Sequence, residues 1–172
     1  MTLIDVLDSA VKIGLGALIT GFFTLKITSK QHFNSLQKDR VSREFELIQD
    51  IANDLENFNH SVLKFWAYTS DYHKKILSQN SHINVEKFND SKTELFNTFS
   101  KLTKIESSLM LLGHADIQRM VRNFGEDVGK FHKSAIDIQS PLSENDFNKF
   151  REDFLTQREL IYKELRAVYL RL

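Results

Sequence analysis

The residue types that carry out most enzyme chemistry are present in this sequence, but their spacing matches no catalytic or metal-binding motif. The six histidines are dispersed, and the chain contains no Glu-x-x-His pair, no His-Glu-x-x-His and no Gly-x-Ser-x-Gly. Cysteine is absent, which excludes a thiolate metal site and a cysteine nucleophile. Glu46, Asp50 and Asp54 share one face of a predicted helix, where a solvated acidic surface explains them better than a cation site. The sequence therefore predicts no catalytic residue, no metal ligand and no cofactor.

A modest basic stripe lies in the third predicted helix, where it would attract phosphate groups of RNA or of anionic lipid. Its members are Arg119, Arg122, Lys130 and Lys133. Glu126 and Asp127 interrupt the stripe, so a salt-bridged surface is the better interpretation. Because 23 basic and 23 acidic residues balance over the whole chain, the sequence does not predict a nucleic-acid partner.

The N-terminal part of the chain has a different composition from the rest. Residues 13–25 carry no charge, and extending this stretch to residues 9–27 gives about 28 Å of helix, close to the roughly 30 Å hydrocarbon core of a bilayer. A cleaved signal peptide fits poorly, because Asp5 and Asp8 precede the stretch and no A-x-A pattern follows it. We therefore expect a transmembrane helix, and a buried core helix is the alternative.

Basic residues directly follow this uncharged stretch. We call them the basic collar: Lys26, Lys30, Lys38, Arg40 and Arg43. Only one acidic residue, Asp39, lies among them, and the opposite flank offers only Lys12. The positive-inside rule then places the N-terminus outside and the bulk of the chain in the cytoplasm, with the collar against lipid headgroups. The expected domains are a transmembrane anchor at 1–29 and a cytoplasmic helical bundle at 30–172.

One side of the expected transmembrane helix consists of small and hydroxyl-bearing residues. These residues lie on or beside one stripe of the helix: Ala10, Gly14, Ala17, Thr20, Gly21, Thr24 and Thr28. Small residues let helices approach closely in lipid, and threonines can bond across the contact. Two interpretations stay open. Either the anchors associate through this face, as a homo-oligomer or around a narrow pore, or Gly and Ala occur here because they are common in membrane helices.

The remaining sequence predicts four amphipathic helices and no sheet. Apolar residues at heptad spacing from Val41 to Ile76 predict a long first helix. Because no Pro or Gly lies between Phe22 and Val41, this helix can continue without a break from the uncharged stretch. The other three predicted helices cover residues 85–112, 116–136 and 144–172. The predicted fold class is therefore all-α, with an N-terminal transmembrane helix continuing into a long helix and a four-helix cytoplasmic bundle.

Individual residues predict where these helices end and where they cross. Gly113 suits the turn after the second helix, and Ser143 with Asp146 forms a capping pair at the start of the last one. Gly125 and Gly129, four residues apart, indicate either a close helix crossing or a weak point in the third helix.

Aromatic residues are dense in the first helix between residues 58 and 72. Trp66 and Tyr68 fall outside its heptad positions. We expect these two side chains to face a further helix, another subunit or a ligand, because aromatic residues are enriched in interface cores.

The short Lys-flanked span VKIGLGALITGFF, the long helix and the helical cytoplasmic portion together resemble small single-pass bacterial inner-membrane proteins. The layout is similar to that of the accessory membrane protein of type VI-B CRISPR systems. The resemblance covers nearly the full length as an architecture without a shared motif. It implies an inner-membrane location, a helical fold related to HEPN domains, and an oligomeric pore that aids antiphage defence.

Three functions follow as hypotheses. The leading one is a non-enzymatic membrane protein that oligomerises through its anchor and bundle, with a pore acting in a stress or antiphage response. The first alternative is a membrane-tethered HEPN-like ribonuclease that uses Arg119, Arg122 or His132. Known HEPN ribonucleases carry Arg followed by His after four to six residues, whereas nine residues separate Arg122 from His132 here. The second alternative is a membrane-tethered adaptor that docks a cytoplasmic protein partner.

Overall fold

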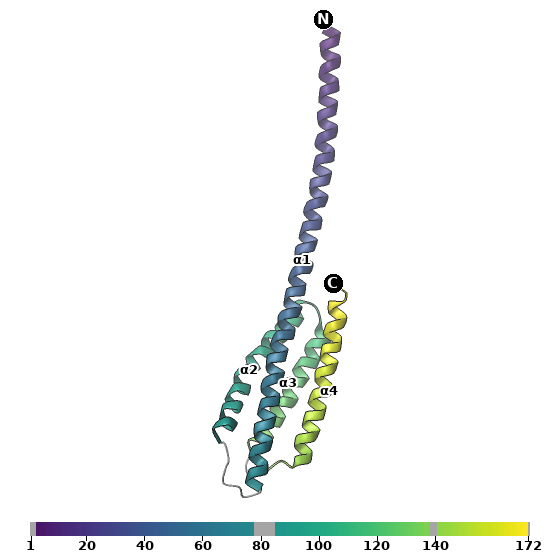
Figure 1. The fold of residues 1–172 in the computed structure, drawn as a ribbon. Helices are drawn as coiled ribbons and strands as arrows, with labels where there is room; N and C mark the ends of the chain where they lie inside the picture. Colours follow the sequence, from purple (N-terminus) through teal and green to yellow (C-terminus); the bar gives the residue numbers. More distant parts are fainter. Residues whose placement is uncertain (1–2, 78–84, 138–140, 172) are drawn as a thin grey trace. The chain divides into compact units, whose positions relative to one another are not determined.

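The described part of the chain consists of helices joined by short turns, and it contains no strand. The computed structural model describes residues 3–77, 85–137 and 141–171, and within them the side chains from residue 24 onward except those of residues 29, 32 and 77. Four helices follow one another: α1 (Leu3–Leu77), α2 (Val85–Leu111), α3 (Ala115–Ala135) and α4 (Glu144–Tyr169) (Figure 1). The chain divides into two compact units, residues 1–43 and residues 44–172. The predicted all-α class and the four helices are confirmed.

Helix α1 is one helix of 75 residues. Its length agrees with a sequence that contains neither proline nor glycine between Phe22 and Leu112. Among the residues whose side chains are described, none of the helices carries a stretch long and apolar enough to cross a membrane. The predicted span at 9–27 lies mostly outside the residues whose side chains are described. The anchor therefore stays a prediction.

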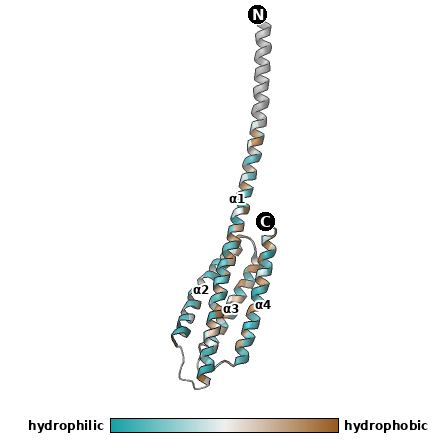
Figure 2. Cartoon of the chain, viewed as in Figure 1, coloured by the Kyte–Doolittle hydropathy of each residue, from teal (hydrophilic) through white to brown (hydrophobic). Residues whose placement is uncertain are grey.

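The unit 44–172 is a bundle in which successive helices run in alternating directions (Figure 1). Hydrophilic and hydrophobic residues alternate along each of its helices, because each helix buries only one face (Figure 2). On α1 the buried heptad positions begin at Ile48 and continue to Thr69, whereas Val41 is exposed. The inner faces predicted for the other helices also supply the core, from Phe88 on α2 through Val121 on α3 to Phe154 on α4.

Phenylalanine rings form the centre of this core. Phe58 contacts the rings of Phe99 on α2 and Phe124 on α3 edge-on, with centroids 5.4 and 5.9 Å apart. Phe131 on α3 stacks on Phe150 of α4 with centroids 3.7 Å apart. Such ring pairs add about 0.5–1.5 kcal/mol each to the burial of apolar area. The rings therefore join all four helices into one core.

Side-chain hydrogen bonds join the neighbouring helices at the bundle surface. They connect Lys64 to Glu94 (2.6 Å), Gln118 to Glu106 (2.6 Å), Gln157 to Asp127 (3.1 Å) and Arg158 to Glu56 (2.9 Å). Partly exposed polar pairs contribute at most about 1 kcal/mol each. We infer that they select the relative register of the helices more than they stabilise the fold.

The predicted helix ends are confirmed at two places. Gly113 adopts a positive φ of 80° between α2 and α3, a conformation that favours glycine. At the start of α4, the backbone N–H of Asp146 donates to Oγ of Ser143 at 3.2 Å, and the backbone N–H of Ser143 donates to Oδ2 of Asp146 at 2.9 Å. This reciprocal pair is a capping box.

The two glycines of α3 should respond differently to alanine. A Cβ at Gly125 would lie 2.7 Å from Cδ1 of Leu102 on α2, whereas a Cβ at Gly129 would meet nothing within 4 Å. Gly129→Ala should therefore raise the free energy of unfolding by about 0.5–1 kcal/mol. Gly125→Ala should be less stable than Gly129→Ala by about 1–3 kcal/mol, because Leu102 must move within a packed core. Urea unfolding of the full chain in mild detergent, followed by circular dichroism, measures both; equal stabilisation would contradict the close crossing.

Candidate functional site

The residues predicted to contact the membrane are only partly covered by the described structure. The described members of the small-residue stripe, Thr24 and Thr28, are exposed, and the side chains of the others lie outside the described residues. The five residues of the basic collar are all exposed. The collar is thus accessible to a charged surface.

Trp66 and Tyr68 differ in their surroundings. Trp66 packs between α1 and α4: its indole Nε1–H donates to the carbonyl oxygen of Phe147 at 2.8 Å, and the guanidinium of Arg151 lies 5.4 Å from the ring centroid. Of the alternatives drawn from the sequence, Trp66 therefore faces a further helix of its own chain. Tyr68 is half-buried, and its place in a subunit interface stays a prediction.

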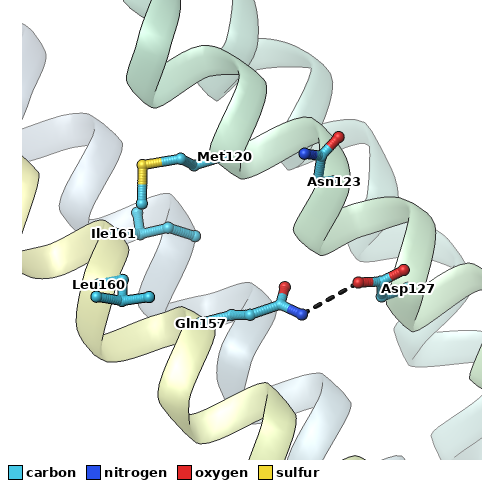
Figure 3. A pocket seen from close by; sticks show the side chains of 6 residues that line it. All are labelled: Met120, Asn123, Asp127, Gln157, Leu160 and Ile161. Atoms are coloured by element: carbon cyan, nitrogen blue, oxygen red, sulfur yellow. Dashed lines mark hydrogen bonds between the residues drawn. The ribbon is translucent and has the colours of Figure 1, made fainter.

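A groove between α3 and α4 contains a hollow of about 280 Å³ (Figure 3). Helix α3 contributes Met120, Asn123 and Asp127, and helix α4 contributes Gln157, Leu160 and Ile161. A second hollow of about 260 Å³ adjoins it and shares Asp127 and Gln157. The groove combines an apolar floor with a small number of polar groups, as ligand sites commonly do.

Asp127 is the charged centre of this groove. Its Oδ1 accepts from Nζ of Lys130 at 2.8 Å. Its Oδ2 accepts from Nε2 of Gln157 at 3.1 Å (Figure 3). The hydrogen bond from Lys130 lowers the pKa of Asp127 and, with the bond from Gln157, outweighs the opposite effect of burial. The carboxylate is therefore ionised at neutral pH.

The chemistry of the groove is that of a binding site. Its lining holds a carboxylate and two amides beside apolar side chains, without a hydroxyl, imidazole or thiol to act as a nucleophile. It suits an apolar group that also forms hydrogen bonds. No pattern in the sequence predicts this groove, because Asp127 and Gln157 are 30 residues apart and only the packing of α3 on α4 brings them together.

A second polar cluster lies between α1 and α4. Oε2 of Glu56 accepts from Arg158 at 2.9 Å and from the hydroxyl of Tyr162 at 3.0 Å. Burial and the hydrogen bond to Glu56 raise the pKa of Tyr162 to about 12. Burial acts to raise the pKa of Glu56, but the bonds from Arg158 and Tyr162 outweigh it and lower that pKa. These contacts join α1 to α4 within one chain, so we assign the cluster a structural role.

The residues of the ribonuclease hypothesis do not converge. Arg119 pairs with Asp116, and Arg122 pairs with Glu106 at 2.9 Å. His132 lies ten positions beyond Arg122 on the same helix, about 15 Å along its axis. Its ring packs against Phe65 with centroids 5.0 Å apart. An arginine and a histidine that share one scissile phosphate would have to lie much closer together.

His132 should make the bundle sensitive to acid. Burial, together with the charge of Lys92, lowers the pKa of His132, so the unfolded chain binds its proton more readily than the folded chain does. The free energy of unfolding should therefore fall as the pH drops through about 6.5, the ordinary pKa of histidine. His132→Phe keeps a ring against Phe65 and should weaken this dependence, as urea unfolding at pH 7.5 and 5.5 would measure. Undiminished acid sensitivity in the variant would contradict this assignment.

In comparisons with known proteins, no family model, no curated protein and no solved structure matches the chain. Within the described residues, no group of three or more His, Asp or Glu side chains is placed to hold a metal ion.

Proposed function

We propose that this chain is a non-catalytic protein of the bacterial inner membrane, anchored by one N-terminal helix and self-associating through its anchor and its cytoplasmic bundle. The observation that carries the proposal is the change in charge and side-chain composition along α1. An uncharged stretch at residues 13–25 is followed by the basic collar, and every described side chain from 24 to 43 is exposed. Exposed apolar residues accompany the collar, including Leu25, Phe33 and Leu36.

A lipid bilayer accounts for these properties together. Its hydrocarbon core would receive the uncharged stretch, and its anionic cytoplasmic surface would attract the collar at about 1 kcal/mol per basic residue. Self-association through the small-residue stripe would then be a contact inside the membrane. The resemblance further implies that the assembly forms a pore and acts in antiphage defence. Ion leakage from liposomes that contain the protein tests the pore.

Extraction of membranes tests the anchor. We expect the chain to stay in the membrane fraction after washing with high salt and after washing with alkaline carbonate. Release by high salt alone would leave only an electrostatic contact through the collar, because salt screens surface charges. Release by alkaline carbonate would contradict a spanning helix.

Replacing Gly14 and Gly21 together by leucine should weaken the assembly of anchors. The two leucines would separate helices that otherwise approach closely through small residues. Light scattering in detergent should show a lower mass for this variant than for the natural chain. A matched control, Leu15→Ile with Phe22→Leu, exchanges bulky residues elsewhere on the helix and should leave the mass unchanged. A natural chain that is strictly monomeric would contradict self-association.

The groove between α3 and α4 favours a second candidate function, the membrane-tethered adaptor. Its apolar floor and its few polar groups suit an apolar side chain of a cytoplasmic partner. Leu160→Arg would place a cation at the edge of the groove and should prevent binding of such a partner. Self-association should be unaffected by this change, which separates the two functions.

A further inference from the structure

Among the residues whose side chains are described, α1 buries more polar side chains than the other three helices together. They are Asn59, Ser61, Thr69, Ser70 and His73 on α1, against Ser91 on α2 and Gln118 on α3. Oγ of Ser91 donates to the carbonyl oxygen of Phe88 at 2.8 Å. Nε2 of Gln118 donates to Oε2 of Glu106 at 2.6 Å. The buried polar side chains of α2 and α3 are thus hydrogen-bonded, as burial normally requires.

Two polar groups on α1 lack such a partner. Thr69 is 0% exposed, and its Oγ1 forms no hydrogen bond with any described residue. His73 is 4% exposed, and its Nε2–H donates to the carbonyl oxygen of Ala135 at 2.9 Å, because a carbonyl oxygen can only accept. The other ring nitrogen of His73, Nδ1, is buried without a partner in the described structure. Because Thr69 and His73 are four residues apart, both groups lie on one face of α1.

The helices that face α1 show the same feature. Nε2 of His132 on α3 and Nε of Arg158 on α4 are buried, and neither has a hydrogen-bond partner among the described residues. The ring of His132 contacts Phe65 of α1, and Arg158 bonds Glu56 of α1. Each of these atoms gives up its hydrogen bond to water without gaining another. The contact of α1 with α3 and α4 is therefore less stable than its apolar area alone would predict.

The other three helices pack more closely on one another. Cα atoms of α3 lie within 8 Å of Cα atoms of α2 and of α4 at many positions, whereas α1 comes this close to another helix at isolated positions at most. Gly125 permits part of the close approach, because a Cβ there would lie 2.7 Å from Cδ1 of Leu102 on α2. Rings such as Phe58 and Phe65 fill the wider spacing between α1 and its neighbours.

We propose that the part of α1 inside the unit 44–172 separates from α2, α3 and α4 while these three stay packed. In the opened state water would bond the hydroxyl of Thr69, Nδ1 of His73 and the atoms of α3 and α4 that face them. This gain offsets part of the apolar contact that is lost, so the opening costs less free energy than unfolding the whole bundle. Helix α1 is thus the moving part of the bundle.

The consequence of this opening for function rests on the proposed anchor. Helix α1 is one helix from Leu3 to Leu77, so the helix that opens also carries the predicted transmembrane span. A change at the membrane would therefore reach the bundle through α1. The opening would then expose inner faces of α2, α3 and α4 that the closed bundle covers.

Hydrogen exchange of the full chain in mild detergent, read by mass spectrometry of its peptides, tests the opening. We expect the slowest amides of residues 51–73 on α1 to exchange at least about tenfold faster than those of residues 117–131 on α3, although both segments lie in the core. Equal rates would overturn the proposal, because they would show that the four helices separate together.

Substitutions separate the opening from unfolding of the whole bundle. Thr69→Val removes the unpartnered hydroxyl and keeps the shape of the side chain, so it should slow exchange on α1 about tenfold. The matched control is Thr98→Val on α2, which removes a hydroxyl that already donates to the carbonyl oxygen of Leu95 at 2.8 Å and should give no slowing. Gly129→Ala stabilises α3 and should slow exchange there about two- to fivefold. It should leave α1 unchanged, because α3 stays packed in the opened state.

Two results with these variants would overturn the opening. One is exchange on α1 that Thr69→Val does not slow, and the other is exchange on α1 that Gly129→Ala slows as much as exchange on α3. Extraction with alkaline carbonate separates this inference from the proposed function. Release of the natural chain would overturn the anchor and the link to the membrane, whereas the exchange rates alone decide whether α1 opens.

Discussion

Replacing Phe58 by alanine should lower the free energy of unfolding by about 3–5 kcal/mol. Phe58 is 0% exposed and lies where α1, α2 and α3 meet, with its ring against Phe99 and Phe124. Alanine would remove both ring contacts and leave a cavity that three packed helices can fill only in part. Natural domains are stable by about 5–15 kcal/mol, so this change consumes a large fraction of the total.

Urea unfolding in mild detergent, followed by circular dichroism, measures this loss. Leu111→Ala is the control, because Leu111 is 79% exposed and its removal should change the stability by no more than about 0.5 kcal/mol. A loss below about 1 kcal/mol for Phe58→Ala would mean that the ring is not enclosed as described.

Replacing Leu18 by lysine should move the chain out of the membrane fraction. Position 18 is near the centre of the predicted span at 9–27, where a lysine costs about 2.5–3.5 kcal/mol of insertion free energy. The span is short and already has Lys12 and Lys26 near its ends, so it has little apolar length to offset a central charge. We therefore expect most of the variant in the soluble fraction after carbonate extraction.

The matched control for this experiment is Gln37→Lys, which adds the same charge to the exposed segment beside the collar. It should leave the chain in the membrane fraction, or bind it more firmly to anionic lipid. Circular dichroism of both variants should show an intact bundle, since positions 18 and 37 both lie outside the unit 44–172 that forms the bundle. Equal partitioning of the two variants would contradict the predicted span.

Periodicity and end signals predicted most of the fold. The heptad positions from Ile48 to Phe65 are buried as expected, because a helix with one apolar face removes that face from water by packing it against other helices. The Ser143–Asp146 pair and the turn at Gly113 depend on neighbouring residues alone, so they too can be recognised in the sequence. Patterns of neighbouring residues thus predict where the helices begin and end and which of their faces are buried.

The groove and the polar contacts between helices could not be predicted in this way. The contacts of Gln157 with Asp127 and of Arg158 with Glu56 depend on how far each helix is shifted along its neighbour in the packed bundle. Periodicity determines which face of a helix is buried but not which turn of one helix lies beside which turn of another. The same reasoning explains Gly125 and Gly129: both are helical glycines, and only the position of Leu102 makes one of them a close crossing.

The position of Trp66 has a practical consequence for optical work on this protein. It is the single tryptophan of the chain, so all indole fluorescence reports one place, the contact between α1 and α4. Separation of these helices would break the bond from Nε1 to Phe147, admit water to the ring and shift its emission to longer wavelength. Binding in the groove between α3 and α4 would leave that emission nearly unchanged. The natural chain thus carries its own spectroscopic label for separation of α1 from α4, and this label does not respond to binding between α3 and α4.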